Sequence, residues 1–324
     1  MGSSTVDAFA ATAPSDESVI DIRSGNVERE LMAYPLGSKI LIQHLDSYIG
    51  GGGTNTAVCF SRLGLKTGYV GKLGKDINGF SILRCLKEEG VTFLGAVGKR
   101  SGFSFILDSQ AHDRTVFTFR GCNDELRYEE VKVNQLDTTW LYSSSLIGES
   151  FETLVRVARV LKARGVKVAF NPSTYLVKKG LDVVGRVLSL CDVVVLNKEE
   201  AQILVGSGEV DFLLKKLLQE VGGIVIVTDG ARGSFASDGK LRYFVAPRDV
   251  QVVESTGAGD AFASTFVAGL AWEKPIIEAM VLAQINAESV IQKHGAKNGL
   301  LRRSELLSLA RKRSYITRVV EVEQ

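Results

Sequence analysis

The sequence contains few of the residues that build metal centres or disulfide frameworks. Its 324 residues include four cysteines and three histidines, and no two cysteines have the Cys-x-x-Cys spacing. The cysteines are far apart and lie mostly among apolar residues, which is typical of reduced thiols in a cytoplasmic protein. The histidines are equally dispersed, which argues against a zinc site. We therefore expect a cytoplasmic protein without disulfides or zinc.

Long apolar runs and an excess of one charge are also lacking. No segment has the length of a membrane span, and the N-terminus lacks the charged-then-apolar pattern of a signal peptide. The net charge is +2 and no dense block of Lys or Arg occurs, which argues against a nucleic-acid partner. We expect neither a membrane nor a nucleic acid as partner, and a chain long enough for one large α/β domain with a small insert.

Strand and helix patterns alternate from about residue 138 onward. The run 193–196 is apolar without alternation, which suits a parallel strand covered on both faces. Three helices follow an antiparallel piece at Ser234–Val253. This pattern predicts an α/β fold with a doubly wound, mostly parallel sheet. The strands are predicted at Thr138–Tyr142, Val166–Phe170, Asp192–Leu196 and Ile224–Thr228, and the helices at Phe151–Ala163, Leu176–Leu190, Lys198–Leu204, Val210–Val221, Ala258–Trp272, Ile276–Lys293 and Ser304–Arg313.

The first 120 residues differ from this pattern. Residues 1–7 are turn-like and end in an acid, and a Gly-rich stretch at residue 50 leads into a helix. Short β pieces are predicted at Ser18–Arg23, Glu30–Tyr34 and Lys39–Tyr48, and a hairpin at Ser104–Asp108 and Thr115–Arg120. We expect a body made of residues 1–7, 50–100 and 121–324, with a β insert made of residues 8–49 and 101–120.

The most informative stretch is Ser255-Thr-Gly-Ala-Gly-Asp260, where a helix is expected to start within the glycines. Glycine allows a ligand to approach the backbone, and the first N–H groups of a helix have no intrahelical partner. These features form an anion site at the positive end of the helix dipole. Asp260 would repel a phosphate there unless it takes a proton from an attacking hydroxyl. The alternative, a plain first-turn acid on a core helix, stays open on the local pattern.

Two further segments suggest ligand binding. The run Gly50–Gly53 leads straight into a helix with Asn55 in its first turn, which favours close ligand approach over a flexible hinge. Asn197 and Glu200 follow a buried strand at its C-terminal end, where they could hold water and magnesium against phosphate oxygens. Taken alone, that pair is also a helix cap with a solvated acid. The turn Thr228–Gly233 is by itself an ordinary hairpin signal, and neither a P-loop nor a dinucleotide fingerprint is present.

In this order and spacing, these segments resemble the ribokinase-like (pfkB) carbohydrate kinase family from Asp7 to about residue 313. The resemblance implies ATP and Mg²⁺ as cofactors and a β insert that acts as a lid over the sugar. It implies Asp260 as the catalytic base, with the amides of Gly257, Ala258 and Gly259 as the anion hole. The remaining implied positions are Asp7, Gly51, Gly52 and Asn55 on the sugar, Asn197 and Glu200 near magnesium and phosphates, and Thr228, Gly230, Gly233 and Gln284 beside the nucleotide.

The chain also departs from the family pattern. Glu254 stands where the family has an aspartate that helps to hold a monovalent cation near Thr256, so the expectation of such a cation is weakened. Gly52 and Ser145 stand where ribokinases carry a lysine and a glutamate, which argues against ribose. The family places a buried strand before the turn at which this chain begins. The sequence therefore predicts either a strand upstream of residue 1 or a sheet that lacks a central strand.

We expect an ATP-dependent kinase that phosphorylates a hydroxyl of a small sugar. Few Lys or Arg residues surround the Gly-rich segment, which suggests an uncharged acceptor, although Arg114 and Arg120 on the predicted hairpin could overturn this. A nucleoside kinase of the same family is the close alternative. A catalytically silent sugar- or nucleotide-binding regulator is a third hypothesis, against which an intact Asp260 argues. The family's lid often forms a dimer contact, so a homodimer through the lid is a further expectation.

Overall fold

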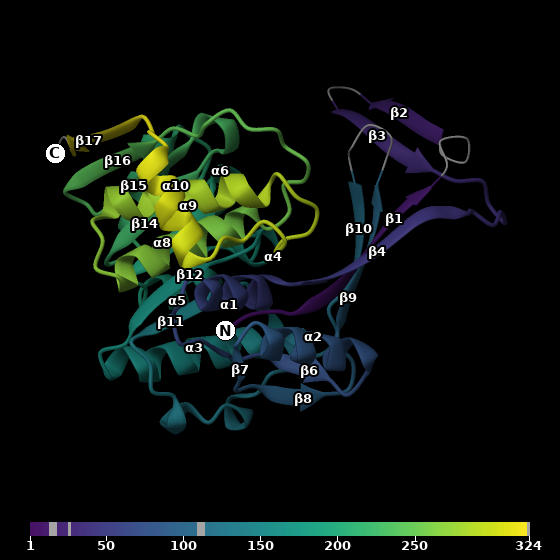
Figure 1. Ribbon diagram of the computed structural model, residues 1–324, viewed down its shortest axis with the longest axis horizontal. Helices are drawn as coiled ribbons and strands as arrows, with labels where there is room; N and C mark the ends of the chain where they lie inside the picture. The colour runs from purple at the N-terminus through teal and green to yellow at the C-terminus, as the bar shows by residue number, and fades with distance from the viewer. Residues whose placement is uncertain (13–17, 25–26, 109–113, 323–324) are drawn as a thin grey trace.

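A seven-stranded mixed sheet forms the centre of the computed structural model, which describes residues 1–12, 18–24, 27–108 and 114–322 (Figure 1). Its strand order is β11-β12-β13-β14-β15-β16-β17. The first four strands are parallel and the last three pairings are antiparallel, which confirms the predicted α/β fold class. The strands are β11 Trp140–Ser144, β12 Lys167–Asn171, β13 Val193–Asn197, β14 Ile224–Thr228, β15 Ser234–Ser237, β16 Leu241–Val245 and β17 Thr317–Glu321.

Helices cover both faces of this sheet (Figure 1). On β13, Val194 belongs to a core with residues of helices α3, α5 and α7. Its neighbour Val195 belongs to a second core with residues of α8 and α9. Since successive strand residues point to opposite faces, an apolar run without alternation is what a doubly covered strand requires. The helices are α1 Gly52–Arg62, α2 Ile77–Glu88, α3 Gly148–Ala163, α4 Thr174–Val177, α5 Leu181–Leu188, α6 Lys198–Val205, α7 Val210–Leu218, α8 Ala258–Ala271, α9 Ile276–Val290 and α10 Arg303–Lys312.

A separate four-stranded sheet projects from the body (Figure 1), and we call it the lid sheet. Its order is β10-β9-β1-β4, with β1 parallel to β9 and antiparallel to β4. Its strands are β1 Thr5–Thr12, β4 Ile42–Gly50, β9 Gly102–Asp108 and β10 Arg114–Phe119, and β2 Ser18–Ser24 pairs with β3 Val27–Ala33 as a hairpin.

The prediction that residues 1–7 form a turn was wrong, because β1 begins at Thr5. Val6, Ala8 and Ala10 are all buried, and this period of two marks a strand with one face on a core. Asp7 therefore lies within a strand of the lid sheet. The first two residues run beside the central sheet, where Met1 N donates to Tyr142 O at 2.6 Å and Ser144 N donates to Met1 O at 3.0 Å.

Other boundaries also differ from the prediction. Leu176–Leu190 is two helices, α4 and α5, because Gly180 adopts φ 80° between them. The antiparallel piece ends at Val245, so residues 250–253 form no strand. Between α1 and the β9–β10 hairpin lie two short parallel strand pairs, β5 Gly68–Tyr69 with β7 Thr92–Phe93 and β6 Lys72–Gly74 with β8 Ala96–Gly98.

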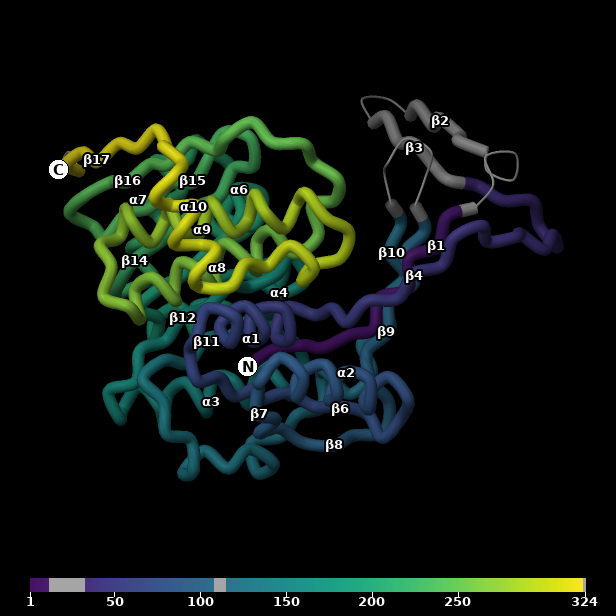
Figure 2. The backbone as a smooth tube through the Cα atoms, in the orientation of Figure 1, coloured from purple at the N-terminus to yellow at the C-terminus, as the bar shows by residue number. Residues whose placement is uncertain are grey.

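Figure 2 traces the chain from an N-terminus beside α1 to a C-terminus at β17. All four cysteines are free thiols. Across the described ranges, no helix has both the length and the apolar character needed to cross a bilayer.

Candidate active site

Helix α8 begins with a backbone that only glycine allows. Gly257 precedes the helix at φ 82°, and a Cβ atom there would lie 2.5 Å from Ala296 Cβ. The bond from Ala261 N to Gly257 O (2.8 Å) is the first of the helix, whereas Ala258 N donates to Ser255 O at 3.3 Å. The N–H groups of Gly259 and Asp260 precede that first bond. A Cβ atom on Gly259 would meet nothing within 4 Å, so this helix start is open to a ligand.

The carboxylate of Asp260 is held by a side chain from another part of the sequence. Asn55 Nδ2 donates to Asp260 Oδ2 at 2.8 Å, and Lys297 Nζ donates to Asn55 Oδ1 at 2.8 Å. Lys297 Nζ also donates to Ile49 O. Three segments that are far apart in sequence, from α1, α8 and the loop after α9, therefore form one continuous hydrogen-bonded chain.

Burial and charge oppose each other in this chain. Burial raises the pKa of Asp260 above its usual range, while the hydrogen bond from Asn55 and the charge of Lys297 lower it. Burial lowers the pKa of Lys297 to about 8, although the negative charges of Asp7 and Asp260 act to raise it. A carboxylate with a raised pKa beside an anion site has the character of a general base.

Asp7 reaches the same region from the lid sheet. A Cβ atom on Gly50 would lie 1.7 Å from Asp7 Oδ2, so the carboxylate occupies the space that a side chain would fill. Burial raises the pKa of Asp7, while hydrogen bonds with the side chains of Thr5 and Ser104 and the charge of Lys297 lower it. The Gly-rich segment is thus packed against specific neighbours, and it is the start of helix α1 rather than a flexible hinge.

Two hydroxyl groups that the sequence did not suggest lie beside Asp260. The Cβ position of Gly52 is 3.1 Å from both Asp260 Oδ1 and Ser144 Oγ. Within the described residues, Ser144 Oγ and Tyr142 OH are buried without a hydrogen-bond partner, which is unusual for buried polar atoms. Burial and the charge of Asp260 both raise the pKa of Tyr142. Polar residues at the C-terminal end of a parallel strand are a signal that could have indicated these positions. By contrast, Ser145 Oγ accepts a hydrogen bond from Ser173 Oγ at 2.7 Å.

Asn197 and Glu200 form a reciprocal helix cap. Glu200 N donates to Asn197 Oδ1 at 2.8 Å and Asn197 N donates to Glu200 Oε2 at 3.2 Å. The cap alternative is therefore realised, but the acid is not solvated, because Glu200 is only 7% exposed. Burial raises its pKa, while hydrogen bonds from Asn197 and Thr174 lower it; the Asp260 charge raises it further. Asn197 lies opposite Thr228 in the β13–β14 register, which brings the cap beside the turn that follows β14.

The described residues contain no group of three His, Cys, Asp or Glu side chains that could hold a metal ion. Magnesium usually binds through one or two carboxylates together with water and substrate phosphates. A buried carboxylate at the carboxyl end of a strand fits an ion that arrives with a nucleotide, and it does not fit an all-protein cage. Glu200 is the residue that could hold such an ion.

Four predicted residues have surroundings that do not by themselves indicate a ligand. Glu254 Oε2 accepts a hydrogen bond from Gly295 N at 2.8 Å and so anchors the loop that carries Lys297. Gln284 Nε2 donates to Glu288 Oε1 at 3.1 Å. Gly230 and Gly233 have φ 51° and 107° around a short turn after β14.

Lys297 is a cation near the Gly-rich segment, around which few Lys or Arg residues were expected. It is 9% exposed, yet it stands in the sequence Gly-Ala-Lys-Asn-Gly, which is typical of a solvated loop. The negative charges of Asp7 and Asp260 balance the positive charge of Lys297, so this lysine does not indicate an anionic acceptor. Arg120 pairs with Asp124 at 2.6 Å, and the side chain of Arg114 lies outside the described residues.

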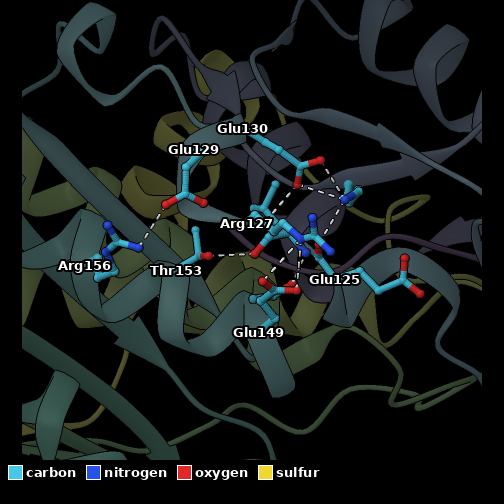
Figure 3. Close-up of polar contacts among 10 residues, drawn as sticks. Glu125, Arg127, Glu129, Glu130, Glu149, Thr153 and Arg156 are labelled. Carbon is cyan, nitrogen blue, oxygen red and sulfur yellow. Dashed lines mark hydrogen bonds and ion pairs between the residues drawn. The ribbon is translucent and has the colours of Figure 1, made fainter.

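A cavity of about 400 Å³ lies elsewhere, along Tyr128 to Gln135 and Arg156. Figure 3 shows Arg156 of the cavity lining pointing toward Glu129, and Arg127, which is not part of the lining, beside Glu149. Arg156 pairs with Glu129 at 3.2 Å and Arg127 with Glu149 at 3.4 Å. Because these opposite charges neutralise each other at the surface, we assign no chemistry to this cavity.

Comparison with known proteins identifies the family of the chain. The family model of the pfkB carbohydrate kinases matches residues 22–303. A ribokinase of Haemophilus influenzae is 30% identical over 283 residues, which are 84% of this chain and 90% of that protein.

Among solved structures, an Escherichia coli ribokinase homologue crystallised with ATP and Mg²⁺ superposes with a TM-score of 0.80 at 20% identity, covering 96% of this chain and 98% of the other. A nucleoside kinase of Methanocaldococcus jannaschii superposes with a TM-score of 0.75 at 19% identity, covering 96% and 97%. At such identities the structures establish a shared fold, and the family match over most of the sequence establishes descent. The chain is a member of the pfkB family of carbohydrate kinases.

Proposed function

We propose that this enzyme transfers the γ-phosphoryl group of ATP to a hydroxyl group of a small uncharged sugar. The observation that carries the proposal is the position of Asp260, a carboxylate with a raised pKa that Asn55 holds beside Gly259. The N–H group of Gly259 precedes the first hydrogen bond of helix α8, and its Cβ position is open. Binding a phosphate alone needs the amides but no carboxylate. A base next to an anion site is useful where a hydroxyl group must lose its proton as it attacks phosphorus.

In the proposed reaction, the acceptor hydroxyl gives its proton to Asp260 while its oxygen forms a bond to the γ-phosphorus. The bond from that phosphorus to the bridging oxygen breaks, and ADP leaves. The amides of Gly257 and Gly259, and that of Ala258 in exchange for its 3.3 Å bond to Ser255 O, stabilise the charge on the transferred oxygens. Glu200, with Asn197 beside it, would hold the Mg²⁺ that accompanies ATP, through water, where the ion neutralises phosphate charge.

The lid sheet supports the assignment of the acceptor site. In its register Asp7 lies opposite both Tyr48 and Ser104, so one face carries polar groups toward the Gly-rich segment. We infer that Asp7, Gly51, Gly52 and Asn55 contact the acceptor. Residues 8–49 and 101–120 would close over it and exclude water from the reaction.

The nucleotide site is proposed around the ends of β13 and β14, with Thr228, Gly230 and Gly233 beside it. The register that places Thr228 opposite Asn197 supports this position. Gln284 is proposed on the adenine side. Glu254 is the candidate for a monovalent cation, although its contact with Gly295 N–H already gives it an anchoring role.

The expected partners follow from the same geometry. The opposite face of the lid sheet exposes Leu45, Phe117 and Phe119, which supports a homodimer through the lid, testable by light scattering of Phe117→Asp. Free thiols at all four cysteines suit a cytoplasmic enzyme. A nucleoside acceptor is the second candidate, since the M. jannaschii neighbour is a nucleoside kinase; assays of ATP consumption with sugars and nucleosides separate the two.

The decisive experiment is Asp260→Asn. Turnover should fall by roughly 100-fold or more, because general-base catalysis contributes about 10²–10⁴, while calorimetric affinity for a non-hydrolysable ATP analogue stays within about threefold. As a matched variant, Asp7→Asn should raise the acceptor KM more than it lowers kcat. Unchanged turnover in Asp260→Asn would refute the role of the base, and the silent regulator would then be favoured.

A further inference from the structure

Lys297 is a buried lysine whose hydrogen bonds are made inside the candidate active site. A lysine ammonium group has three donors and no acceptor, and lysine is rarely buried unless it is paired. Here Nζ donates to Asn55 Oδ1 at 2.8 Å and to Ile49 O. The loop that carries it is fixed by Arg62, which donates to Lys297 O at 2.8 Å and to Leu300 O at 3.0 Å.

This contact determines the orientation of the Asn55 amide. Because the ammonium group of Lys297 can only donate, it selects the carbonyl end of the amide, Oδ1. Because the carboxylate of Asp260 can only accept, it selects the amine end, Nδ2. A flipped amide would place oxygen against the carboxylate and N–H groups against the ammonium. Both neighbours therefore favour the same one of two orientations.

The orientation of Asn55 in turn determines which oxygen of Asp260 is free. Oδ2 accepts from Asn55 Nδ2 at 2.8 Å. Oδ1 lies 3.1 Å from the Cβ position of Gly52, where glycine leaves space. The available lone pairs of the carboxylate thus point to the Gly-rich segment.

We propose that Lys297 is a positioning residue for phosphoryl transfer, which locks the Asn55 amide so that Asp260 presents Oδ1 to the acceptor hydroxyl. The proposal rests on the proposed role of Asp260 as the base. The charge of Lys297 has a second effect on the same group. It favours the ionised form of Asp260, which burial disfavours, so loss of the charge should move the acid limb of the kcat profile to higher pH.

The charged and titratable groups that face Lys297 come from four elements. They are Asp7 on β1, Arg62 on α1, Cys85 on α2 and Asp260 on α8. The two carboxylates favour the ammonium form and Arg62 opposes it. A purely structural lysine in this position would stabilise the loop without any effect on the ionisation of Asp260.

The test compares Lys297→Ala, Lys297→Gln and a control, Lys72→Met. Lys72 is similarly buried, at 8% exposure, and pairs with Glu130 at 2.8 Å outside the site. The measurements are kcat and acceptor KM from pH 5 to 9 with the best acceptor of the sugar and nucleoside screen, together with thermal midpoints. In addition, n-propylammonium is added to Lys297→Ala, with 1-propanol as its uncharged counterpart.

We expect Lys297→Ala to lower kcat at least 10-fold, with less than a threefold change in KM and an acid limb moved to higher pH. Propylammonium, and not propanol, should recover part of kcat. Lys297→Gln retains a donor for Asn55 but no charge, so it should keep more of the plateau kcat and show the same shift of the acid limb. Lys72→Met should lose thermal stability without any shift of the limb.

Three outcomes overturn the inference: an unmoved acid limb in both Lys297 variants, an effect confined to KM, or the same limb shift in Lys72→Met. If Lys297→Ala does not fold, Lys297→Gln decides the question through its acid limb. Asp260→Asn distinguishes a failure of the proposed function from a failure of the inference about Lys297. Full turnover in Asp260→Asn removes the proposed function, whereas lost turnover in Asp260→Asn with an indifferent Lys297 removes only this inference.

Discussion

Gly257 and Gly259 allow the anion hole to be tested by two methyl groups placed two residues apart. An alanine at 257 would have to adopt φ 82° and would meet Ala296 at 2.5 Å. An alanine at 259 would lie in a helix and point into open space. If the γ-phosphoryl group binds against Gly259, Gly257→Ala should mainly lose stability, whereas Gly259→Ala should mainly lose activity.

The magnitudes follow from the two environments. The left-handed conformation costs a non-glycine residue roughly 1–2 kcal/mol, and overpacking adds about 1–3 kcal/mol. The free energy of unfolding of Gly257→Ala should therefore be lower than that of the native protein by roughly 2–5 kcal/mol. Alanine is a better helix former than glycine by at most about 1 kcal/mol, so Gly259→Ala should be as stable as the native protein or slightly more stable. Its methyl group should nevertheless lower kcat by about 10²-fold, near the loss that follows removal of one oxyanion donor.

The assay measures chemical denaturation, steady-state turnover and nucleotide affinity for both variants. Gly259→Ala should bind ADP, which lacks the transferred phosphoryl group, nearly as well as the native enzyme and the ATP analogue less well. A Gly259→Ala enzyme that is fully folded and turns over at the native rate would show that no phosphate approaches this helix start. The assignment of the anion hole would then be wrong.

Three other predictions concern charges. Glu200→Gln should raise the Mg²⁺ concentration needed for half-maximal rate by about tenfold or more at unchanged thermal stability, because it removes a desolvated charge and keeps a hydrogen-bonding partner for Asn197; an unchanged Mg²⁺ requirement contradicts the metal role. Arg62→Met should destabilise by about 2–3 kcal/mol, since Arg62 pairs with Glu89 at 2.5 Å. Arg62 holds the pKa of Glu89 below its usual range, so the stability that the pair contributes is fully present above the unfolded pKa of glutamate, near 4.3. The difference in thermal midpoint between the native protein and Arg62→Met should therefore shrink as pH falls below about 4. A constant difference from pH 3 to 8 argues against the ion pair. Finally, because burial raises the pKa of Asp260, native kcat should fall as pH drops through a value above that of a free aspartate, about 3.9, and an acid limb at or below 3.9 contradicts a buried base.

The local sequence pattern was sufficient to predict an element where the residue types of that segment themselves indicate which faces are buried. The strand at 193–196 and the helix start at 257–260 were both predicted from sequence, since double-sided covering and a glycine cap leave a signature in consecutive letters. The period of two in β1 is also present in Val6, Ala8 and Ala10, but the Gly-Ser-Ser segment directly before it is typical of a turn and obscures the strand pattern. The break at Gly180 could not be predicted in this way, because a lone glycine is tolerated in a helical pattern and only the structure gives its φ.

Strand β17 could not be predicted because it depends on a distant partner. All five of its residues are exposed, so no apolar alternation marks it. It exists through backbone pairing with β16, about 75 residues earlier in the chain. Edge strands of this kind are stabilised by hydrogen bonds that any sequence without proline can make.

The candidate site shows the same limit in a sharper form. A run of glycines says that something approaches the backbone, but it does not say what. In the structure each glycine has its own neighbours. Asp7 lies over Gly50, and Asp260 and Ser144 lie beside Gly52. Lys297 is 242 residues from the asparagine that it contacts, and its own neighbours suggest a solvated loop. Since each partner is supplied by a different element, the chemistry of this site depends on tertiary placement, and substitutions at Asn55 or Lys297 should affect Asp260 more than their local sequence would suggest.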